Sequence, residues 1–537
     1  MAASIQPRNY AGRASFRAFE NRLMSKQSQR KTLEETEFGD FQTPPDLAAE
    51  VCDLLCRLGL NPGSIVEPTC GEGSLLFQAL DHFPDAHQAI AHDVSPLYIA
   101  PVRARLQRRV YANRVSILQG NFFQTDWPQL IDKLPEPILV VGNPPWITSA
   151  QIGALGGANL PEKTNFQKHK GLNAKTGKSN FDISEWMLIR ILHWLDNRTG
   201  TLAMLCKTAV ARKLLFHAWK GDLSLSDAAL YHINAAKHFG ATVDACLFVC
   251  NFAPNAYNHD CSVFDTLTSP VPKRIIGYRD HELVSKVNLY EQWKHLKGNE
   301  LYKWRSGIKH DCSKVMELTK EGSKYRNGLG QLVELEDNYL YPMLKTSEVA
   351  KPDAIPTRYM LVPQTFVGED TSTIKSLAPL TWQYLEDHGN LLDKRGSSIY
   401  KERPRFSVFG VGDYSFAPWK VAISGFYKRL GFKIVGPVEG KPVMLDDSSY
   451  SIPCRSAAEA ALIASLFNSQ PASEFFEAYI FWDAKRPITS DLLRRLDLSQ
   501  VARELRLGAD LQQFLLPAPI KIRRKRLAVP RQEALQL

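Results

Sequence analysis

The chain of 537 residues is long enough for about two to four domains, and its 44% hydrophobic and 23% charged residues are ordinary for a folded protein. No run approaches the ~18 consecutive apolar residues of a membrane span, and the N-terminal segment lacks the apolar stretch of a secretory signal. The formal net charge of +10 favours a polyanionic partner.

Basic residues are concentrated near both ends of the chain. Residues 1–33 hold seven Lys or Arg and one acidic residue, and the sequence KIRRKR occupies 521–526. We interpret 1–35 as a basic arm and 516–537 as a basic tail, which are either solvated ends or contacts for a polyanion. The nine cysteines form no CxxC pair and have no histidine at ligand spacing, so we expect reduced thiols in a cytoplasmic protein and no metal site.

Strands and helices alternate in the first half of the chain. After the loop sequence FQTPP at 41–45, apolar residues recur at helical spacing. Short apolar runs predict strands at the start of 64–80, within 88–95, 115–123 and 137–146, and at 200–206 and 244–252, with an amphipathic helix at 181–195. This alternation predicts an α/β fold with a mostly parallel sheet, helices on both faces and a ligand crevice at the carboxyl ends of the strands.

A glycine turn follows the first predicted strand. In the sequence VEPTCGEGSLL, Gly71 and Gly73 stand between that strand and a helix, where glycine lets the backbone turn tightly and approach a ligand. Leu76 occupies the position of the third glycine of a dinucleotide fingerprint, which argues against NAD or FAD. Asp93, at the end of the second predicted strand, is placed to accept hydrogen bonds from ribose hydroxyls. An ordinary turn followed by a surface Asp would give the same pattern.

The fourth predicted strand ends in VVGNPPW, where an amide, two rigid prolines and an indole follow one another at 143–146. With EPTCGEG and FQTPP before it, this motif resembles the gamma class of DNA adenine-N6 methyltransferases of bacterial restriction–modification systems, over residues 36–255. The resemblance implies a Rossmann-like class I methyltransferase domain at 36–260 that uses S-adenosylmethionine. A strand that ends in a turn with a packed Trp is the alternative.

The resemblance also implies which residues bind the cofactor, with FQTPP covering its methionine end. These residues are Thr43, Pro44, Glu67, Pro68, Thr69, Cys70, Gly71, Gly73, Asp93, Asn121, Phe122 and Asn143.

The chemistry of amino methylation fits the NPPW residues, which are the expected catalytic ones. An aromatic amino group is a poor nucleophile because its lone pair is delocalised into the ring, and two acceptors on its N–H groups favour a tetrahedral nitrogen with a localised lone pair. We expect these acceptors to be the Asn143 side-chain oxygen and the Pro144 carbonyl, held by the rigid unit with Pro145. Trp146 is expected to stack on the base, which has to be flipped out of the duplex.

Two positions depart from the pattern of the family. The family most often has Tyr or Phe where this chain has Trp146, and it usually has Asp at the third strand end, where QGNFF places Asn121. An Asn can still hydrogen-bond the cofactor adenine, but it carries no charge. We therefore expect a base pocket of different size and weaker cofactor binding.

The region 261–515 is expected to be an α+β domain for target recognition. Its segments 304–311, 346–349 and 391–424 resemble the DNA-recognition region of the gamma class, and 394–433 holds nine Lys or Arg against two acidic residues, with aromatic residues interleaved. A domain with a basic face and an aromatic core is the alternative. The expected DNA contacts are Arg305, Lys309, Lys394, Arg395, Tyr400, Lys401, Arg403, Lys420, Lys485 and Arg486.

These observations predict a site-specific DNA methyltransferase that modifies adenine N6 in double-stranded DNA at the bacterial nucleoid. We find no convincing Asp…Glu-x-Lys nuclease motif, so any cleavage is expected from a separate restriction nuclease. Two alternatives stay open. One is an RNA adenine or guanine-N2 methyltransferase, and the other is a methyltransferase-like subunit of a defence complex that binds DNA without turnover.

Overall fold

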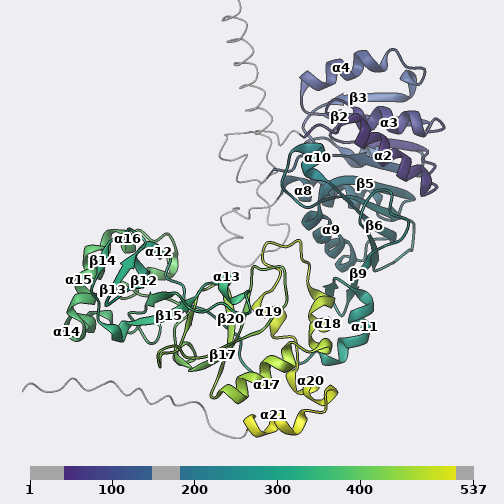
Figure 1. Cartoon of the computed structure of the whole chain (residues 1–537). Helices are drawn as coiled ribbons and strands as arrows, with labels where there is room; N and C mark the ends of the chain where they lie inside the picture. Colours follow the sequence, from purple (N-terminus) through teal and green to yellow (C-terminus); the bar gives the residue numbers. More distant parts are fainter. Residues whose placement is uncertain (1–40, 148–181, 516–537) are drawn as a thin grey trace, which may run out of the picture. The chain divides into compact units, whose positions relative to one another are not determined.

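The computed structural model describes residues 41–147 and 182–515. The chain forms two compact units, an N-terminal unit that ends at Val284 and a C-terminal unit that begins at Ser285 (Figure 1). The predicted basic arm at 1–35 and basic tail at 516–537 lie outside the described residues. No helix within the described ranges is both long and apolar enough to span a membrane.

The N-terminal unit is built on one sheet, whose described strands follow the order β10-β9-β8-β6-β7-β5-β4-β1-β2-β3. Strands β1 to β5 run parallel, and β7 lies antiparallel between β5 and β6. The strands span Ser64–Glu67 (β1), Gln88–Asp93 (β2), Val115–Gln119 (β3), Ile138–Gly142 (β4), Gly200–Lys207 (β5), Leu225–Ile233 (β6), Ala245–Phe252 (β7), Asp260–Phe264 (β8), Arg274–Arg279 (β9) and Glu282–Val284 (β10).

Helices cover both faces of this sheet, as the sequence predicts (Figure 1). Leu139 and Val141 of β4 share one buried core with α2, α3 and α4, whereas α8 and α9 contribute nothing to that core and pack on β5 from the other side. Every residue of β1 and β4 is buried, as expected for a parallel strand covered on both faces. The helices are α2 (Pro45–Arg57), α3 (Ser74–His82), α4 (Pro96–Leu106), α5 (Trp127–Ile131), α8 (Ile183–Leu195), α9 (Thr208–Lys220) and α10 (Ala235–Phe239).

The N-terminal unit extends beyond the boundary at 260 that the sequence predicts. Strand β8 pairs with β6 in parallel, and β9 and β10 continue the sheet in antiparallel pairs. These short strands bury only part of their residues, so their sequence mixes polar and apolar residues and does not indicate strands. The six predicted strands and the helix at 181–195 are confirmed within the described residues, but no strand is predicted at 225–233, where β6 lies.

The C-terminal unit is an α+β domain, as expected. One sheet has the order β14-β13-β12-β16-β15-β19, and a second has the order β11-β20-β17-β18. The strands are β11 (Arg305–Ser306), β12 (Glu317–Glu321), β13 (Lys324–Asn327), β14 (Leu332–Val333), β15 (Leu340–Leu344), β16 (Arg358–Leu361), β17 (Trp419–Ser424), β18 (Lys433–Val435), β19 (Met444–Leu445) and β20 (Ser449–Cys454).

Helices pack beside both sheets of the C-terminal unit. The α15 helix belongs to the core of the six-stranded sheet, whereas α17 packs on β17, β18 and β20. The helices are α11 (Val287–Trp293), α12 (Ser313–Met316), α13 (Thr346–Val349), α14 (Ile374–Leu377), α15 (Pro379–Asp387), α16 (Gly389–Asp393), α17 (Ala457–Phe467), α18 (Gln470–Tyr479), α19 (Ser490–Leu493), α20 (Leu498–Glu504) and α21 (Gly508–Leu515).

Candidate functional site

A cavity of about 560 Å³ opens at the carboxyl ends of β1, β2, β3 and β4. Parallel strands end at the same edge of a sheet, so the loops after them meet there. Ten of the predicted site residues line this cavity: Thr43, Glu67, Pro68, Thr69, Cys70, Gly71, Asp93, Phe122, Asn143 and Pro145. Five others lie close in sequence but are not among its lining residues: Pro44, Gly73, Asn121, Pro144 and Trp146.

The glycine turn forms one wall of the cavity. Gly71 has a φ of 47°, in the left-handed region that favours glycine, and a Cβ there would overlap the side-chain amide of Gln42. The Glu72 backbone N–H donates to Gln42 Oε1 at 2.8 Å. The segment 41–43 therefore packs directly on the turn.

Asp93 connects the turn to the loop after β2. Its Oδ2 accepts a hydrogen bond from the Gly71 N–H at 2.9 Å, and its Oδ1 accepts one from the Ser95 N–H at 2.9 Å. The Asp93 carboxylate therefore ties the glycine turn to the loop after β2 and lies at the cavity wall.

Glu67 places a buried carboxyl group in the cavity wall. Its side chain is 2% exposed, and Oε2 is buried without a hydrogen-bond partner. Burial raises the pKa of Glu67 well above its ordinary value and the charge of Asp93 raises it further, whereas the Leu76 backbone N–H at the start of α3 lowers it. An uncompensated buried acceptor is costly, so this oxygen is suited to a ligand that donates a proton or carries positive charge.

Asn143 has a fixed orientation. Its Nδ2 donates to the backbone carbonyl of Phe41 at 2.8 Å, and its Oδ1 is buried without a partner. A carbonyl can only accept a hydrogen bond, so the Nδ2 group has to face Phe41 and Oδ1 has to face the other way. The side chain therefore offers one unoccupied acceptor at the cavity.

Apolar side chains surround the mouth of the cavity. Phe41 is 36% exposed, Val94 38% and Leu97 69%, and all three line it. Phe122, buried at the end of β3, adds an aromatic wall. Exposed apolar residues that converge on a cleft with a few polar groups favour a ligand with a planar or apolar part.

Trp146 does not lie where the sequence analysis places it. The indole is 6% exposed and belongs to the core that contains α2 and α3, and its Nε1 donates to the Leu205 carbonyl at 3.4 Å. Its ring centroid lies 5.8 Å from that of Phe41 and 5.1 Å from that of Phe239, so the three rings form one aromatic cluster. Phe239, at the end of α10, was missed because it follows β6, for which the sequence analysis gave no strand.

Asn121 also differs from its expected place. Its Oδ1 accepts a hydrogen bond from the Phe123 N–H at 2.8 Å, which closes a local turn after β3. Phe122 lines the cavity instead.

His92 is a cavity residue that the sequence analysis did not select. It is 2% exposed; Nδ1 lies 3.2 Å from the Pro68 carbonyl and Nε2 lies 3.0 Å from Thr125 Oγ1. Burial lowers the pKa of His92. The His92 ring thus connects the loop after β1 to the loop after β3.

Sequence comparison decides the family. No protein-family model matches the chain. The type II methyltransferase M.NspV of a Nostoc species is 45% identical over 471 residues, which cover 87% of this chain and 97% of that protein. This chain belongs to the type II methyltransferases.

Solved structures also resemble this type II methyltransferase. The type IIL restriction-modification enzyme MmeI, in complex with DNA, aligns with a TM-score of 0.48 and 13% identity over 88% of this chain and 66% of that one. A type I restriction-modification methyltransferase subunit from Streptococcus thermophilus aligns with a TM-score of 0.29 and 16% identity over 42% of this chain and 48% of that one.

The C-terminal unit of the methyltransferase has a basic cavity of about 450 Å³. Lys309 and Arg486, two predicted DNA contacts, line it together with Arg494, which the sequence analysis missed. Asp447 also lines the cavity, with its carboxylate 3.9 Å from the Lys309 ammonium. Three cations from separate segments therefore converge on one site.

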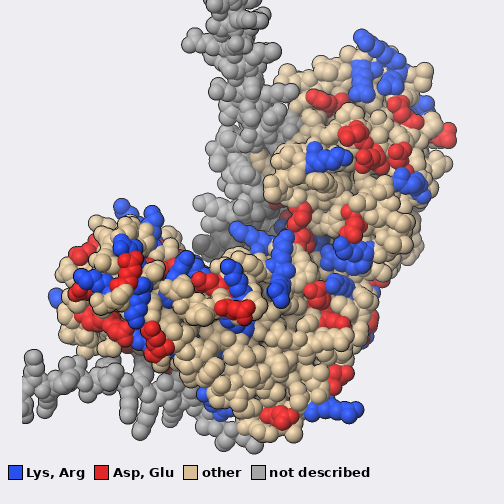
Figure 2. Space-filling view, viewed as in Figure 1, with Lys and Arg blue, Asp and Glu red and all other residues tan. Residues whose placement is uncertain are grey.

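Other predicted DNA contacts are divided between surface and interior. Figure 2 shows Lys and Arg side chains on the surface of the C-terminal unit, interspersed with acidic ones. Six predicted contacts are exposed: Arg305, Lys394, Lys401, Arg403, Lys485 and Arg486.

Lys420 corrects one prediction, because it is 2% exposed and its Nζ donates to the Ala417 carbonyl at 2.7 Å. An ammonium group buried on β17 cannot reach a DNA phosphate. Arg395 is half-buried and donates to the carbonyls of Leu392, His310 and Ser407. Its guanidinium lies 3.8 Å from the Tyr400 ring centroid, so both residues serve local packing.

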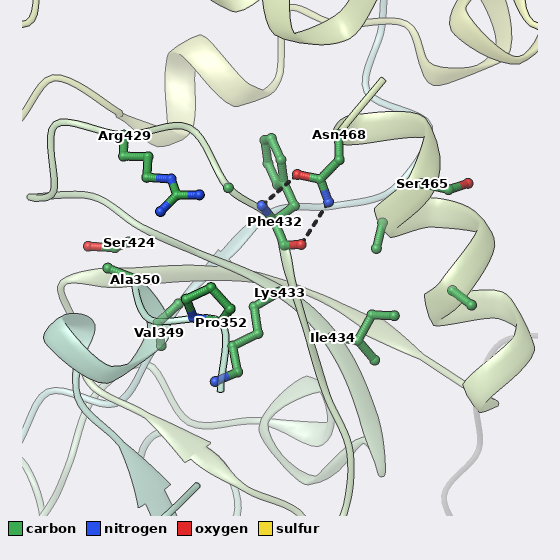
Figure 3. A pocket seen from close by; sticks show the side chains of 13 residues that line it. Val349, Ala350, Pro352, Ser424, Arg429, Phe432, Lys433, Ile434, Ser465 and Asn468 are labelled. Carbon is green, nitrogen blue, oxygen red and sulfur yellow. Dashed lines mark hydrogen bonds between the residues drawn. The ribbon is translucent and has the colours of Figure 1, made fainter. Parts of the chain in front are cut away.

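A third cavity of about 550 Å³ lies beside β18 and α17 (Figure 3). Asn468 has both ends of its amide occupied, because Oδ1 accepts from the Phe432 N–H at 2.9 Å and Nδ2 donates to the Phe432 carbonyl at 2.8 Å. Lys433 donates to the carbonyls of Lys351 and Ala354. The polar side chains of this third cavity therefore largely have hydrogen-bond partners, whereas Glu67 and Asn143 in the first cavity each have a buried oxygen without one.

Proposed function

We propose that this protein transfers a methyl group from S-adenosylmethionine to the N6 amino group of an adenine in double-stranded DNA. The observation that carries the proposal is the buried, unpartnered Oδ1 of Asn143, a residue that lines the first cavity and whose Nδ2 is held by the Phe41 carbonyl. Membership of the type II methyltransferases supports the reaction class.

The residues of the first cavity fit S-adenosylmethionine. The Glu67 Oε2 is a buried acceptor suited to the cofactor's ammonium group, and the absence of a Cβ at Gly71 lets Gln42 pack on the glycine turn. Asp93 lines the same cavity and is the expected acceptor for ribose hydroxyls, while Phe122, Val94 and Leu97 offer apolar surface for the adenine ring. The cofactor, when bound, supplies an electrophilic methyl group on a sulfonium, so the protein mainly has to bind and orient.

Asn143 would activate the amino group of the base. Its Oδ1 accepts one N–H of the exocyclic nitrogen, and the backbone carbonyl of Pro144 accepts the other. Both bonds favour a tetrahedral nitrogen whose lone pair is available for the methyl group. Pro145, which follows directly, restricts the backbone so that the Pro144 carbonyl keeps its direction.

The loop that carries this motif is held firmly. The Lys207 ammonium donates to the Trp146 carbonyl at 3.0 Å and to Asp182 at 2.5 Å, and the Ile183 N–H donates to the Ile147 carbonyl at 2.9 Å. Phe239 and Phe41 lie against Trp146, and this aromatic cluster supplies ring surface for a flipped base. Stacking on Trp146 itself requires the cluster to open.

The C-terminal unit would bind the duplex. Lys309, Arg486 and Arg494 converge on one cavity and are suited to a DNA phosphate. The exposed Arg305 and Lys394 add positive charge on the same unit. A separate restriction nuclease would recognise the same target sequence.

A methyl-transfer assay with labelled cofactor tests the proposal. We expect label in duplex DNA and none in RNA. Asn143→Ala should abolish transfer and leave cofactor binding largely intact, whereas Asn113→Ala, at an exposed position, should do neither. Transfer to RNA would establish the RNA alternative, and cofactor and DNA binding without transfer by the wild-type protein would establish the non-catalytic subunit.

A further inference from the structure

The first cavity has a cofactor half and a base half, and one short segment of the chain contacts both. The glycine turn between β1 and α3 belongs to the cofactor half, and Asn143 at the end of β4 belongs to the base half. Residues 41–43, here called the strap, contact both.

The strap contacts Asn143 through its backbone. The Phe41 carbonyl accepts from Asn143 Nδ2 at 2.8 Å, and no substitution of the Phe41 side chain removes that carbonyl. If the strap moved away, the amide could rotate and present its NH₂ group to the base. A donor would then face the N–H groups of the base, and the acceptor needed for activation would be lost.

The strap contacts the glycine turn through a side chain. Gln42 Oε1 accepts the Glu72 N–H at 2.8 Å, and the Gln42 amide lies where a Cβ of Gly71 would be. Gln42 is therefore packed on the turn as well as hydrogen-bonded to it. A shift of the glycine turn has to move Gln42. Because Phe41 is the neighbouring residue, the same shift moves the Phe41 carbonyl.

We infer that Gln42 is a positioning residue, through which the cofactor-binding turn sets the orientation of the Asn143 amide. The inference rests on the proposed function, because it assigns the cofactor to the turn and the base to Asn143. A cofactor that orders the turn would at the same time fix the strap and the catalytic acceptor. Binding of the first substrate would thus prepare the site for the second.

Two substitutions separate this role from simple packing. Gln42→Met keeps the length of the side chain but removes the acceptor, whereas Gln42→Glu keeps an acceptor oxygen for the Glu72 N–H. Gln107→Met makes the same chemical change at an exposed position after α4 and serves as the matched control. Each variant is measured for cofactor affinity by calorimetry and for single-turnover methyl transfer to duplex DNA at saturating cofactor and DNA.

We expect Gln42→Met to lower the saturated transfer rate about tenfold, the effect of raising the barrier by ~1.4 kcal/mol, in addition to weakening cofactor binding. Gln42→Glu should recover most of that rate, and Gln107→Met should match the wild type. A Gln42→Met variant that binds cofactor more weakly but reaches the wild-type rate at saturation overturns the inference, because Gln42 would then only build the cofactor site. If the wild-type protein transfers no methyl group to DNA, the proposed function itself is wrong.

Discussion

Glu67 offers a prediction in which stability and binding change in opposite directions. Its Oε2 is buried without a partner, and burial raises the pKa of Glu67 well above its ordinary value. The folded state therefore holds this proton more tightly than the unfolded chain does. As pH rises above the usual Glu pKa of about 4.3, the free energy of unfolding of the cofactor-free protein falls, until the folded-state pKa is passed.

Glu67→Gln removes the buried charge and keeps the shape of the side chain. We take the difference between a buried carboxylate and a neutral amide as about 1–2 kcal/mol, which corresponds to about 2–8 °C in the melting temperature of a domain of this size. The variant should match the wild type near pH 5 and melt higher near pH 8. Without the carboxylate, a charge-assisted hydrogen bond to the cofactor ammonium is lost, so the Kd for S-adenosylmethionine should rise about 10- to 100-fold.

The assay is thermal unfolding between pH 5 and pH 8, with and without S-adenosylmethionine, together with calorimetric binding. Glu72→Gln, at the exposed carboxyl group of the same turn, is the matched control and should change neither quantity. If Glu67→Gln bound the cofactor as tightly as the wild type, the carboxylate would not contact the ammonium group. If the variant melted lower at pH 8, Glu67 would be stabilising the fold as an ion.

Two further predictions concern the C-terminal unit. Arg486→Ala and Arg494→Ala should each reduce the slope of log affinity for duplex DNA against log salt concentration by about 1. The control Arg503→Ala, at an exposed position on α20, should leave the slope unchanged. Equal slopes in all three variants would exclude the basic cavity as a phosphate site. Burial lowers the pKa of Lys420 to about 7, so the unfolded chain binds more protons above that pH and stability should rise from pH 7 to pH 10. Lys420→Met should remove this rise in stability, increase the melting temperature at pH 7 and leave DNA affinity unchanged. A loss of DNA affinity without a loss of stability would show that Lys420 contacts DNA after all.

The sequence predicts the catalytic half of the fold because its signals are local. Buried parallel strands are short apolar runs, and the residues that follow them have to meet at one sheet edge, so the sequence alone assigns Glu67, Asp93 and Asn143 to one cavity. Ser226, Asp227 and His232 interrupt the apolar sequence of β6, so no strand is predicted there and Phe239 after it could not be assigned.

Other residues could not be placed because tertiary contacts decide where their side chains go. Trp146 follows the prolines as predicted, but Phe41 and Phe239 hold its indole in the core. Asn121 has the right position along β3, yet its side chain closes a turn. Lys420 belongs to a basic stretch of sequence, but β17 is buried from Lys420 to Ser424, so its side chain lies in the interior. Charge along a sequence therefore does not show which cations reach the surface.

The most direct test of the central claim is mass spectrometry of the nucleosides from duplex DNA that has been incubated with the protein and S-adenosylmethionine. We expect N6-methyldeoxyadenosine with the wild-type protein and with Asn113→Ala, and none with Asn143→Ala. Methylation of another base, or N6-methyldeoxyadenosine formed at the wild-type rate by Asn143→Ala, would contradict it.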